Sequence, residues 1–265
     1  MAVRIPRAIL LAPLAALASH GAASGASGPA CDARGAVTGV IARFGDRLEP
    51  VLADGRTLRP LGLDPADRGP ADSARLAAAR RDLDATYGGA TIQFRAIGGK
   101  ADRWGRVPAL IFLGDPPRPL AAEIVGLGDA RARPETGALN CMAALLAAEA
   151  SARGAGLGLW ADPLYSVIDA RDGAALRKAD GRFAVVEGAV TKAGVGRRNG
   201  WLDFGPRGSL SAVVSIKRMR MFGWTSRSLQ NLVGRRLRLR GLLDARFGPK
   251  LTLTWPEQVE TPEAR

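Results

Sequence analysis

The sequence predicts a mainly β protein with helices, and three observations support this prediction. Short stretches of alternating apolar and polar residues recur along the chain and are bounded by Gly, Asp and Asn, as β-strands are. They fall into two sets, and in each set a helical pattern separates the third strand from the fourth. Hydrophobic residues make up 47% of the 265 residues and charged residues 24%, which is typical of a globular chain. Five strands with a helix before the fourth are typical of the small closed barrel called the OB-fold.

The first set of strands lies within residues 31–161. Asp54 and Gly55 supply a turn between the second and third strands, and Gly88 and Gly89 end the helix that follows. We expect these elements at residues 37–44, 48–52 and 56–63 (strands), 71–86 (helix), 90–97 and 107–113 (strands), and 120–127 and 140–153 (helices). The expected first domain is therefore an OB-like barrel with three helices.

The second set lies within residues 182–260, after a connector at residues 162–181. Asn199 and Gly200 supply a tight turn in this set. We expect its elements at residues 174–179 (a short helix in the connector), 183–193, 201–204 and 210–216 (strands), 225–232 (helix), and 235–243 and 251–255 (strands). A second OB-like module is the prediction, with another small barrel or a flat meander as the alternative.

Residues 1–23 have the features of an export signal. Arg4 and Arg7 precede an apolar run at residues 8–18, and small residues follow it. This run is shorter than the roughly 20 residues that cross a bilayer, and no later segment is long enough. We therefore expect a signal peptide that is removed, a periplasmic or secreted protein, and no membrane span.

The chain has two cysteines, Cys31 and Cys141. In an oxidising compartment an even pair of cysteines favours a disulfide. A bond that closes a loop of about 110 residues would stabilise the fold by roughly 4–5 kcal/mol in the chain-entropy model. Two buried free thiols are the alternative.

The one histidine, His20, lies inside the expected signal peptide. The remaining sequence has no histidine, which excludes Ser-His-Asp and Cys-His mechanisms and zinc sites with histidine ligands. Any hydrolytic chemistry must come from carboxylates, arginines, hydroxyls and a hard metal ion.

Basic residues outnumber acidic ones, with 38 Lys and Arg against 25 Asp and Glu and a formal net charge of +13. The excess is concentrated in residues 166–265, which hold 19 basic and 9 acidic residues. A basic region of this kind is typical of proteins whose partner is a polyanion such as nucleic acid. A solvated basic surface that serves solubility is the alternative.

Charged residues in three segments of the first module lie at strand ends, where a rigid scaffold can direct them at a ligand. Asp46 lies in the first hairpin, and Arg59, Asp64 and Asp67 lie at or just beyond the third strand, while Arg106 enters the fifth. Arginine stays protonated and binds two phosphate oxygens at once. Asp46 and Asp64 could hold Ca²⁺ together with carbonyls and waters. Such charges also occur on many solvated surfaces.

Three motifs carry a resemblance to a known family: LRPLGLDPAD, DRWGR followed by the apolar VPALIFLGD, and LLAAEASARGAGLGLW. In order and spacing they resemble the staphylococcal nuclease (thermonuclease) family over roughly residues 36–161. The resemblance implies that Asp46 and Asp64 are calcium carboxylates and that Arg59 and Arg106 grip the scissile phosphate. It implies that Asp67 orients the attacking water. Members of that family cleave DNA and RNA, so an exported calcium-dependent nuclease is expected.

Several positions depart from the family pattern. Asp67 stands where the family has glutamate, and misplacing a catalytic group by about 1 Å can cost on the order of a hundredfold in rate. Phe44 replaces an acidic residue, Arg47 replaces a threonine beside the metal, and Pro65-Ala66 replaces threonine-proline. The alternative hypothesis is therefore a catalytically impaired nucleic-acid-binding protein that retains the nuclease fold.

Further nucleic-acid contacts are expected in both modules. Arg103 and Trp104 adjoin Arg106, and the indole could stack on a base or pack in the core. Alternation along residues 235–240 places Arg236, Arg238 and Arg240 on one face of a strand, where they could follow phosphates. A charged strand edge that prevents aggregation is the alternative.

Overall fold

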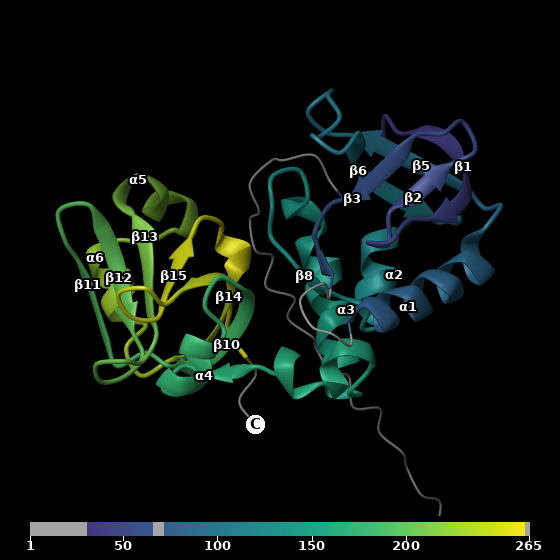
Figure 1. Cartoon of the computed structure of the whole chain (residues 1–265). Helices are drawn as coiled ribbons and strands as arrows, with labels where there is room; N and C mark the ends of the chain where they lie inside the picture. Colours follow the sequence, from purple (N-terminus) through teal and green to yellow (C-terminus); the bar gives the residue numbers. More distant parts are fainter. Residues whose placement is uncertain (1–30, 66–71, 263–265) are drawn as a thin grey trace, which may run out of the picture.

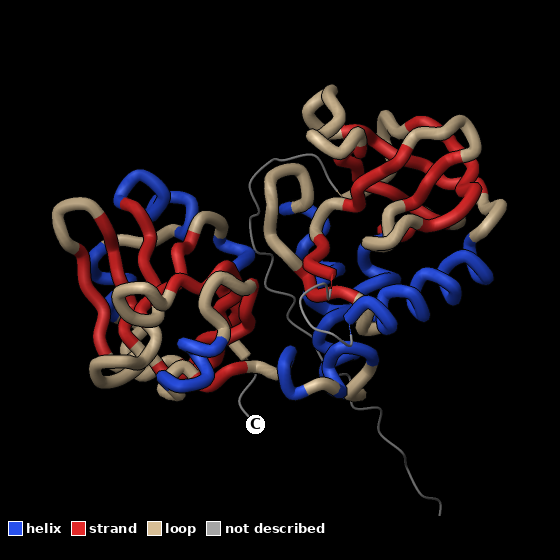
Figure 2. Tube along the Cα trace, viewed as in Figure 1, coloured by secondary structure: helices blue, strands red, loops and turns tan. Residues whose placement is uncertain are grey.

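Two large β-sheets, a small two-stranded sheet and flanking helices make up the part of the chain that the structure describes, residues 31–65 and 72–262 of a computed structural model (Figure 1). The expected signal peptide and Asp67 lie outside the described residues. Figure 2 shows the strands of the two sheets as two separate groups, joined by a segment of short helices.

The first sheet closes into a five-stranded barrel. The sheet has six strands in the order β3-β2-β1-β5-β6-β7. Because β3 also pairs in parallel with β6, the first five strands of this order close the barrel, and β7 extends the sheet beyond β6. These strands are β1 (Val37–Phe44), β2 (Pro50–Leu52), β3 (Thr57–Pro60), β5 (Thr91–Ala96), β6 (Arg106–Leu113) and β7 (Arg118–Pro119). The predicted fold class, mainly β with an OB-like barrel and helices, is confirmed.

One expected strand, residues 56–63, is divided in the structure. It forms β3 and then β4 (Leu63–Pro65), which leaves the barrel and pairs with β8 (Ala130–Ala132). The break falls at Gly62, which has a φ of 91° and whose Cβ, if present, would lie 2.6 Å from the Leu145 side chain. Only glycine fits this turn without strain.

Three helices cover one end of the first barrel (Figure 1). They are α1 (Asp72–Tyr87), α2 (Leu120–Gly126) and α3 (Met142–Gly154), and the 3₁₀ turn η1 (Leu139–Cys141) leads into α3. Leu76, Ala79 and Leu83 of α1 are buried, as the helical spacing predicts. A disulfide joins Cys31 to Cys141, so the expected pairing is confirmed.

The C-terminal module, residues 182–260, follows a connector with the turns η2 (Gly158–Ala161) and η3 (Pro163–Tyr165), the strand β9 (Ile168–Asp169) and the helix α4 (Gly173–Lys178). Its sheet runs in the order β11-β12-β13-β15-β14-β10-β9. The remaining elements are β10 (Phe183–Ala189), β11 (Lys192–Val195), β12 (Asn199–Asp203), β13 (Ser211–Ser215), α5 (Ile216–Met219), η4 (Arg220–Phe222), α6 (Ser226–Gln230), β14 (Arg236–Asp244), β15 (Lys250–Leu253), η5 (Pro256–Gln258) and β16 (Val259–Glu260).

The C-terminal module repeats the strand order of the first barrel. The expected strand at residues 183–193 is divided into β10 and β11, which are consecutive in the chain but far apart in the sheet order: β11 is at one end, and β10 lies next to β9 at the other. The third and fifth strands of the set, β13 and β15, pair in parallel as β3 and β6 do. Within the described residues, every helix is too short or too polar to cross a lipid bilayer.

Candidate nucleic-acid interface

The register of β3 and β6 places Arg59 and Arg106 on one face of the first barrel. Thr57 of β3 pairs with Arg106 of β6, and Arg59 lies two residues beyond Thr57 on the same strand. Because side chains two apart on a strand share a face, both guanidinium groups project from the same side of the sheet. The strand register thus places the two arginines on a common face, and their role in gripping a phosphate stays a prediction.

Arg59 is held by a carboxylate that the sequence analysis missed. Its Nη1 donates to both carboxylate oxygens of Glu135, at 3.1 and 3.0 Å. The Gly62 amide donates to Glu135 Oε1 at 2.9 Å. The charge of Arg59 is therefore balanced within the chain.

Arg106 is held more tightly, by two carboxylates. Its Nη1 donates to Glu49 Oε1 at 2.7 Å, and its Nε donates to Asp102 Oδ2 at 3.0 Å. Burial alone would lower the pKa of Arg106, but the bonds to Asp102 and Glu49 outweigh burial and hold this pKa above its usual value. Only 15% of the Arg106 side chain is exposed.

The two proposed calcium carboxylates are each paired with an arginine. Asp46 is 90% exposed and accepts from Arg80 of α1 at 2.6 Å. Asp64 is buried on β4 and accepts from Arg131 of β8 at 2.7 Å. No group of three or more acidic, Cys or His side chains that could hold a metal occurs in residues 31–65 and 72–262. The neighbouring guanidinium groups repel a cation, and Ca²⁺ takes six to eight oxygen ligands. Calcium binding by Asp46 and Asp64 stays a prediction, because Asp67 lies outside the described residues.

Trp104 lies at the surface, next to Arg103 and Arg106. Its indole is 61% exposed, with the guanidinium carbons of Arg103 and Arg106 at 3.9 and 4.8 Å from the ring centroid. A core position for Trp104, the alternative reading of the sequence, is therefore wrong. An exposed aromatic ring flanked by cations is suited to stacking on a base.

The three arginines of β14 do not form the exposed strip that alternation predicted. Arg236 is exposed, but its Nε donates to Glu187 at 2.6 Å. Arg238 is 13% exposed and binds the same carboxylate. Hydrogen bonds from these two arginines hold the pKa of Glu187 below its usual value, although burial acts in the other direction.

Arg240 is fully buried, which corrects its expected role as a phosphate contact. Its Nη2 donates to Glu149 of α3 at 2.6 Å and also to Glu260, while its Nη1 donates to the Ala132 carbonyl of β8 at 2.8 Å. Arg240 therefore joins the C-terminal module to the first barrel and has no surface to offer a ligand.

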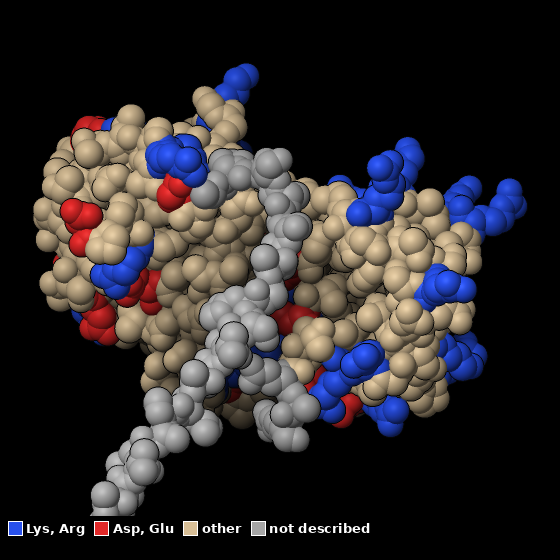
Figure 3. All heavy atoms as spheres, turned by 180° about the vertical axis from the view of Figure 1, so that it is seen from behind, with Lys and Arg blue, Asp and Glu red and all other residues tan. Residues whose placement is uncertain are grey.

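Cations without a carboxylate partner gather instead at another part of the C-terminal module, although one of them, Arg218, donates to the Thr254 carbonyl at 3.0 Å. The β11–β12 turn carries Arg197 and Arg198, and the Arg198 carbonyl accepts from the Ile216 amide at the start of α5. Within the described residues, none of the cations at this junction makes an ion pair. We call this set the basic edge: Arg197, Arg198, Lys217, Arg218 and Arg220. On the face drawn in Figure 3, the C-terminal module shows many basic and few acidic side chains.

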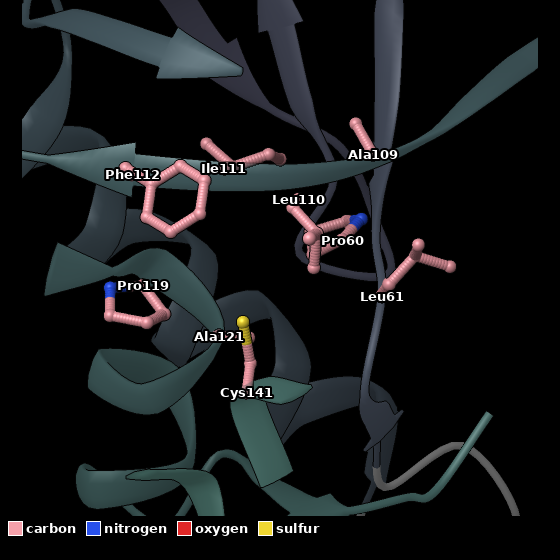
Figure 4. Close-up of a pocket in the computed structure, with 9 residues that line it drawn as sticks. All are labelled: Pro60, Leu61, Ala109, Leu110, Ile111, Phe112, Pro119, Ala121 and Cys141. Carbon is pink, nitrogen blue, oxygen red and sulfur yellow. The ribbon is translucent and has the colours of Figure 1, made fainter. Parts of the chain in front are cut away.

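Two cavities add no site of defined chemistry. A void of about 10 Å³ in the first barrel is lined by apolar residues and reaches Cys141 (Figure 4). A larger cavity of about 530 Å³ lies between the connector and the C-terminal module. Its charged lining residues are Arg131, Lys178, Arg182, Asp162, Asp169 and Asp172. Because the lining has three cationic side chains and three carboxylates, its charge favours neither an anionic nor a cationic ligand.

The residues that sequence reasoning missed share one property, their distance along the chain from their partners. Glu135 lies 76 residues from Arg59, and Glu49 lies 57 residues from Arg106. No local pattern brings such residues together. The dipeptide Arg197-Arg198 at a predicted turn was a local signal for the basic edge.

The fold defines the class of this chain: an OB-like barrel with helices, followed by a second sheet of the same strand order. No protein-family model matches the sequence, and no curated protein matches it.

Proposed function

We propose that the chain is an exported nucleic-acid-binding protein that retains a thermonuclease-like barrel without an efficient hydrolytic centre. One observation carries the proposal: charge is balanced internally at the candidate nuclease site and left unbalanced at the basic edge. Arg59, Arg106, Asp46 and Asp64 each have an oppositely charged partner within 3 Å. The basic edge has none among the described residues.

The basic edge supplies the electrostatic part of binding. Cations that neutralise phosphates release the counterions condensed on the nucleic acid, so affinity falls steeply with salt. Nearby, the rings of Phe222, the last residue of η4, and of Trp224 lie with their centroids 4.6 Å apart and are partly buried against the core of the module. Cations that neutralise the backbone, together with aromatic rings on which bases stack, are the usual means of binding single strands without sequence preference.

Export is part of the proposal. The disulfide between Cys31 and Cys141 is of the kind that persists in oxidising compartments, and the sequence of residues 1–23 has the pattern of a signal peptide. A periplasmic or secreted location follows from both observations.

Hydrolysis is the second candidate function, and the shared face of Arg59 and Arg106 favours it. Two guanidinium groups on one face could bind a phosphodiester and stabilise charge in its transition state. If cleavage occurs, Arg59→Ala and Arg106→Ala should each remove most of it while circular dichroism shows an unchanged fold. Full activity in either variant would refute that assignment.

The test combines binding and cleavage on one sample. A labelled single-stranded 20-mer, as DNA and as RNA, is titrated by fluorescence anisotropy with Ca²⁺ or with EDTA, and the same samples are then run on a denaturing gel. We expect binding in both conditions and no shortening of the strand. Absence of binding at low salt would overturn the proposal, and calcium-dependent shortening would establish the second candidate in its place.

A further inference from the structure

We propose that Glu135 acts as an internal competitor for an anion site formed by Arg59 and the Gly62 amide. The carboxylate lies where a phosphate group would bind, and it lowers the affinity of this site for phosphate. The inference deepens the proposed function, and it rests on that function only for the claim that the phosphate belongs to a nucleic acid.

The donors around Glu135 form the type of site that binds anions. Arg59 Nη1 donates to both carboxylate oxygens, and the Gly62 amide donates to one of them at 2.9 Å. A guanidinium group and a backbone N–H directed at one point bind carboxylate and phosphate alike. The same donors would therefore serve a phosphate oxygen.

The geometry of this site does not depend on Glu135. Gly62 owes its turn to its φ of 91° and to the packing of Leu145 against its Cα. The Leu61 amide, one residue earlier, donates to the Ala109 carbonyl of β6 at 3.1 Å. Because β3 and β6 fix the turn, removing the charge of Glu135 should leave the Gly62 amide in place.

Arg59 keeps donors for a second acceptor. Both of its hydrogen bonds within the described residues come from Nη1, which leaves Nε and Nη2 without a partner there. The main obstacle to a phosphate is therefore the negative charge of Glu135, not a lack of donors. Like charges in one site repel each other, and removing one of them relieves the repulsion.

A phosphate can replace the carboxylate partner of Arg59 more easily than a carboxylate partner of Arg106. The Arg59 and Glu135 side chains are 28% and 22% exposed, so water can replace their contacts as they separate. Arg106 and Glu49 are 15% and 8% exposed, and Asp102 holds Arg106 a second time. A partly exposed ion pair is weaker than a buried one with several bonds, because solvent screens it.

The experiment uses the full chain and four variants: Glu135→Gln, Glu123→Gln, Arg59→Gln, and the double variant Glu135→Gln/Arg59→Gln. Glu135→Gln keeps an acceptor for the Gly62 amide and removes the charge. Glu123→Gln is the matched control, because Glu123 of α2 pairs with the exposed Arg118 of β7 and its loss changes the net charge equally. Inorganic phosphate is the probe, followed by ³¹P NMR line broadening, and a labelled dT12 is titrated in parallel.

We expect Glu135→Gln to bind phosphate at least fivefold more tightly than the parent chain and Glu123→Gln to leave the affinity unchanged. Arg59→Gln alone should change the phosphate affinity little, because Glu135 already balances the charge of Arg59. In the double variant, the loss of Arg59 should abolish the gain in affinity that Glu135→Gln produces. If Glu135→Gln unfolds at the assay temperature, Glu135→Asp, which withdraws the carboxylate by one methylene, should give a smaller gain.

Equal affinity in Glu135→Gln and Glu123→Gln would overturn the inference, as would a gain that persists in the double variant. The dT12 titration separates this outcome from failure of the proposed function. Parent chain that binds dT12 without any phosphate gain in Glu135→Gln would leave the function standing and remove the competitor. A gain in phosphate affinity in Glu135→Gln without dT12 binding by the parent chain would support the competitor and contradict the proposed function.

Discussion

Charged residues in the first barrel mostly meet a partner of opposite charge inside the chain. The half-buried carboxylate of Asp129 does so only in part. It follows α2, and burial together with the charge of Asp82 raises its pKa to about 6, although Arg75 acts in the opposite direction. An unfolded aspartate has a pKa of about 3.9. The native state therefore binds this proton more tightly, and stability falls as pH rises from about 4 to about 6.

Asp129→Asn should raise the free energy of unfolding at pH 7.5 by on the order of 1 kcal/mol, after allowance for the solvent that still reaches the group. At pH 4 the substitution should have no effect, because the native carboxyl is then protonated. Urea denaturation at the two pH values measures the difference, with the exposed Asp115→Asn as a control. A gain at pH 4 as large as at pH 7.5 would contradict the assignment.

At the scale of secondary-structure elements, the neighbours of a strand determine whether one of its faces is free to bind a ligand. Strand β14 is an example. The alternating sequence correctly predicts that Arg236, Arg238 and Arg240 share a face. It does not reveal that this face meets α3, because Glu149 lies 91 residues from Arg240. Burial would lower the pKa of Arg240, but Glu149 and Glu260 outweigh burial and raise it. The face joins two modules instead of meeting a ligand.

Arg240→Ala should lower the free energy of unfolding by about 3–5 kcal/mol, because it leaves Glu149 charged and buried without its main partner. Arg236→Ala on the same strand should cost at most about 1 kcal/mol, since 63% of the Arg236 side chain is exposed. Chemical denaturation followed by circular dichroism compares the two. Similar losses in both variants would contradict the coupling of α3 to β14.

At the scale of the whole molecule, one covalent bond and one buried ion cluster hold distant parts of the chain together. The disulfide joins residues separated by 110 positions. It links Cys31, which lies just before β1, to Cys141 at the end of η1. Arg240 ties the C-terminal module to β8 and α3. The two modules are therefore connected by more than the segment between them.

Reducing the disulfide should lower the free energy of unfolding by roughly 4 kcal/mol, because the unfolded chain regains the freedom of a long loop. Urea denaturation with and without dithiothreitol measures this change. A Cys31→Ala/Cys141→Ala variant should match the reduced protein and ignore the reductant. Equal stability of the oxidised and reduced chains would contradict a stabilising role.

The barrel could be predicted from the sequence because its signals are local: alternation in the strands, the spacing of Leu76 and Leu83, and turns at glycines. The prediction missed two strand divisions, one at Gly62 in the first barrel and one after Ala189 in the C-terminal module. At both positions the strand changes partner without losing its alternating pattern. The cysteine pairing was predictable because only one pair exists. The charge partners of Arg59 and Arg106 were not, since contact between them depends on the closed barrel.

The salt dependence of dT12 binding tests the central claim most directly. Arg197→Gln/Arg198→Gln removes two charges from the basic edge, and Arg43→Gln/Arg81→Gln removes two exposed charges from the first barrel. Each phosphate contact to a single strand contributes about 0.7 to the slope of log affinity against log salt. We expect a slope shallower by about 1.4 in the first variant and unchanged in the second. An unchanged slope in the first variant, or equal losses in both, would contradict binding at the basic edge.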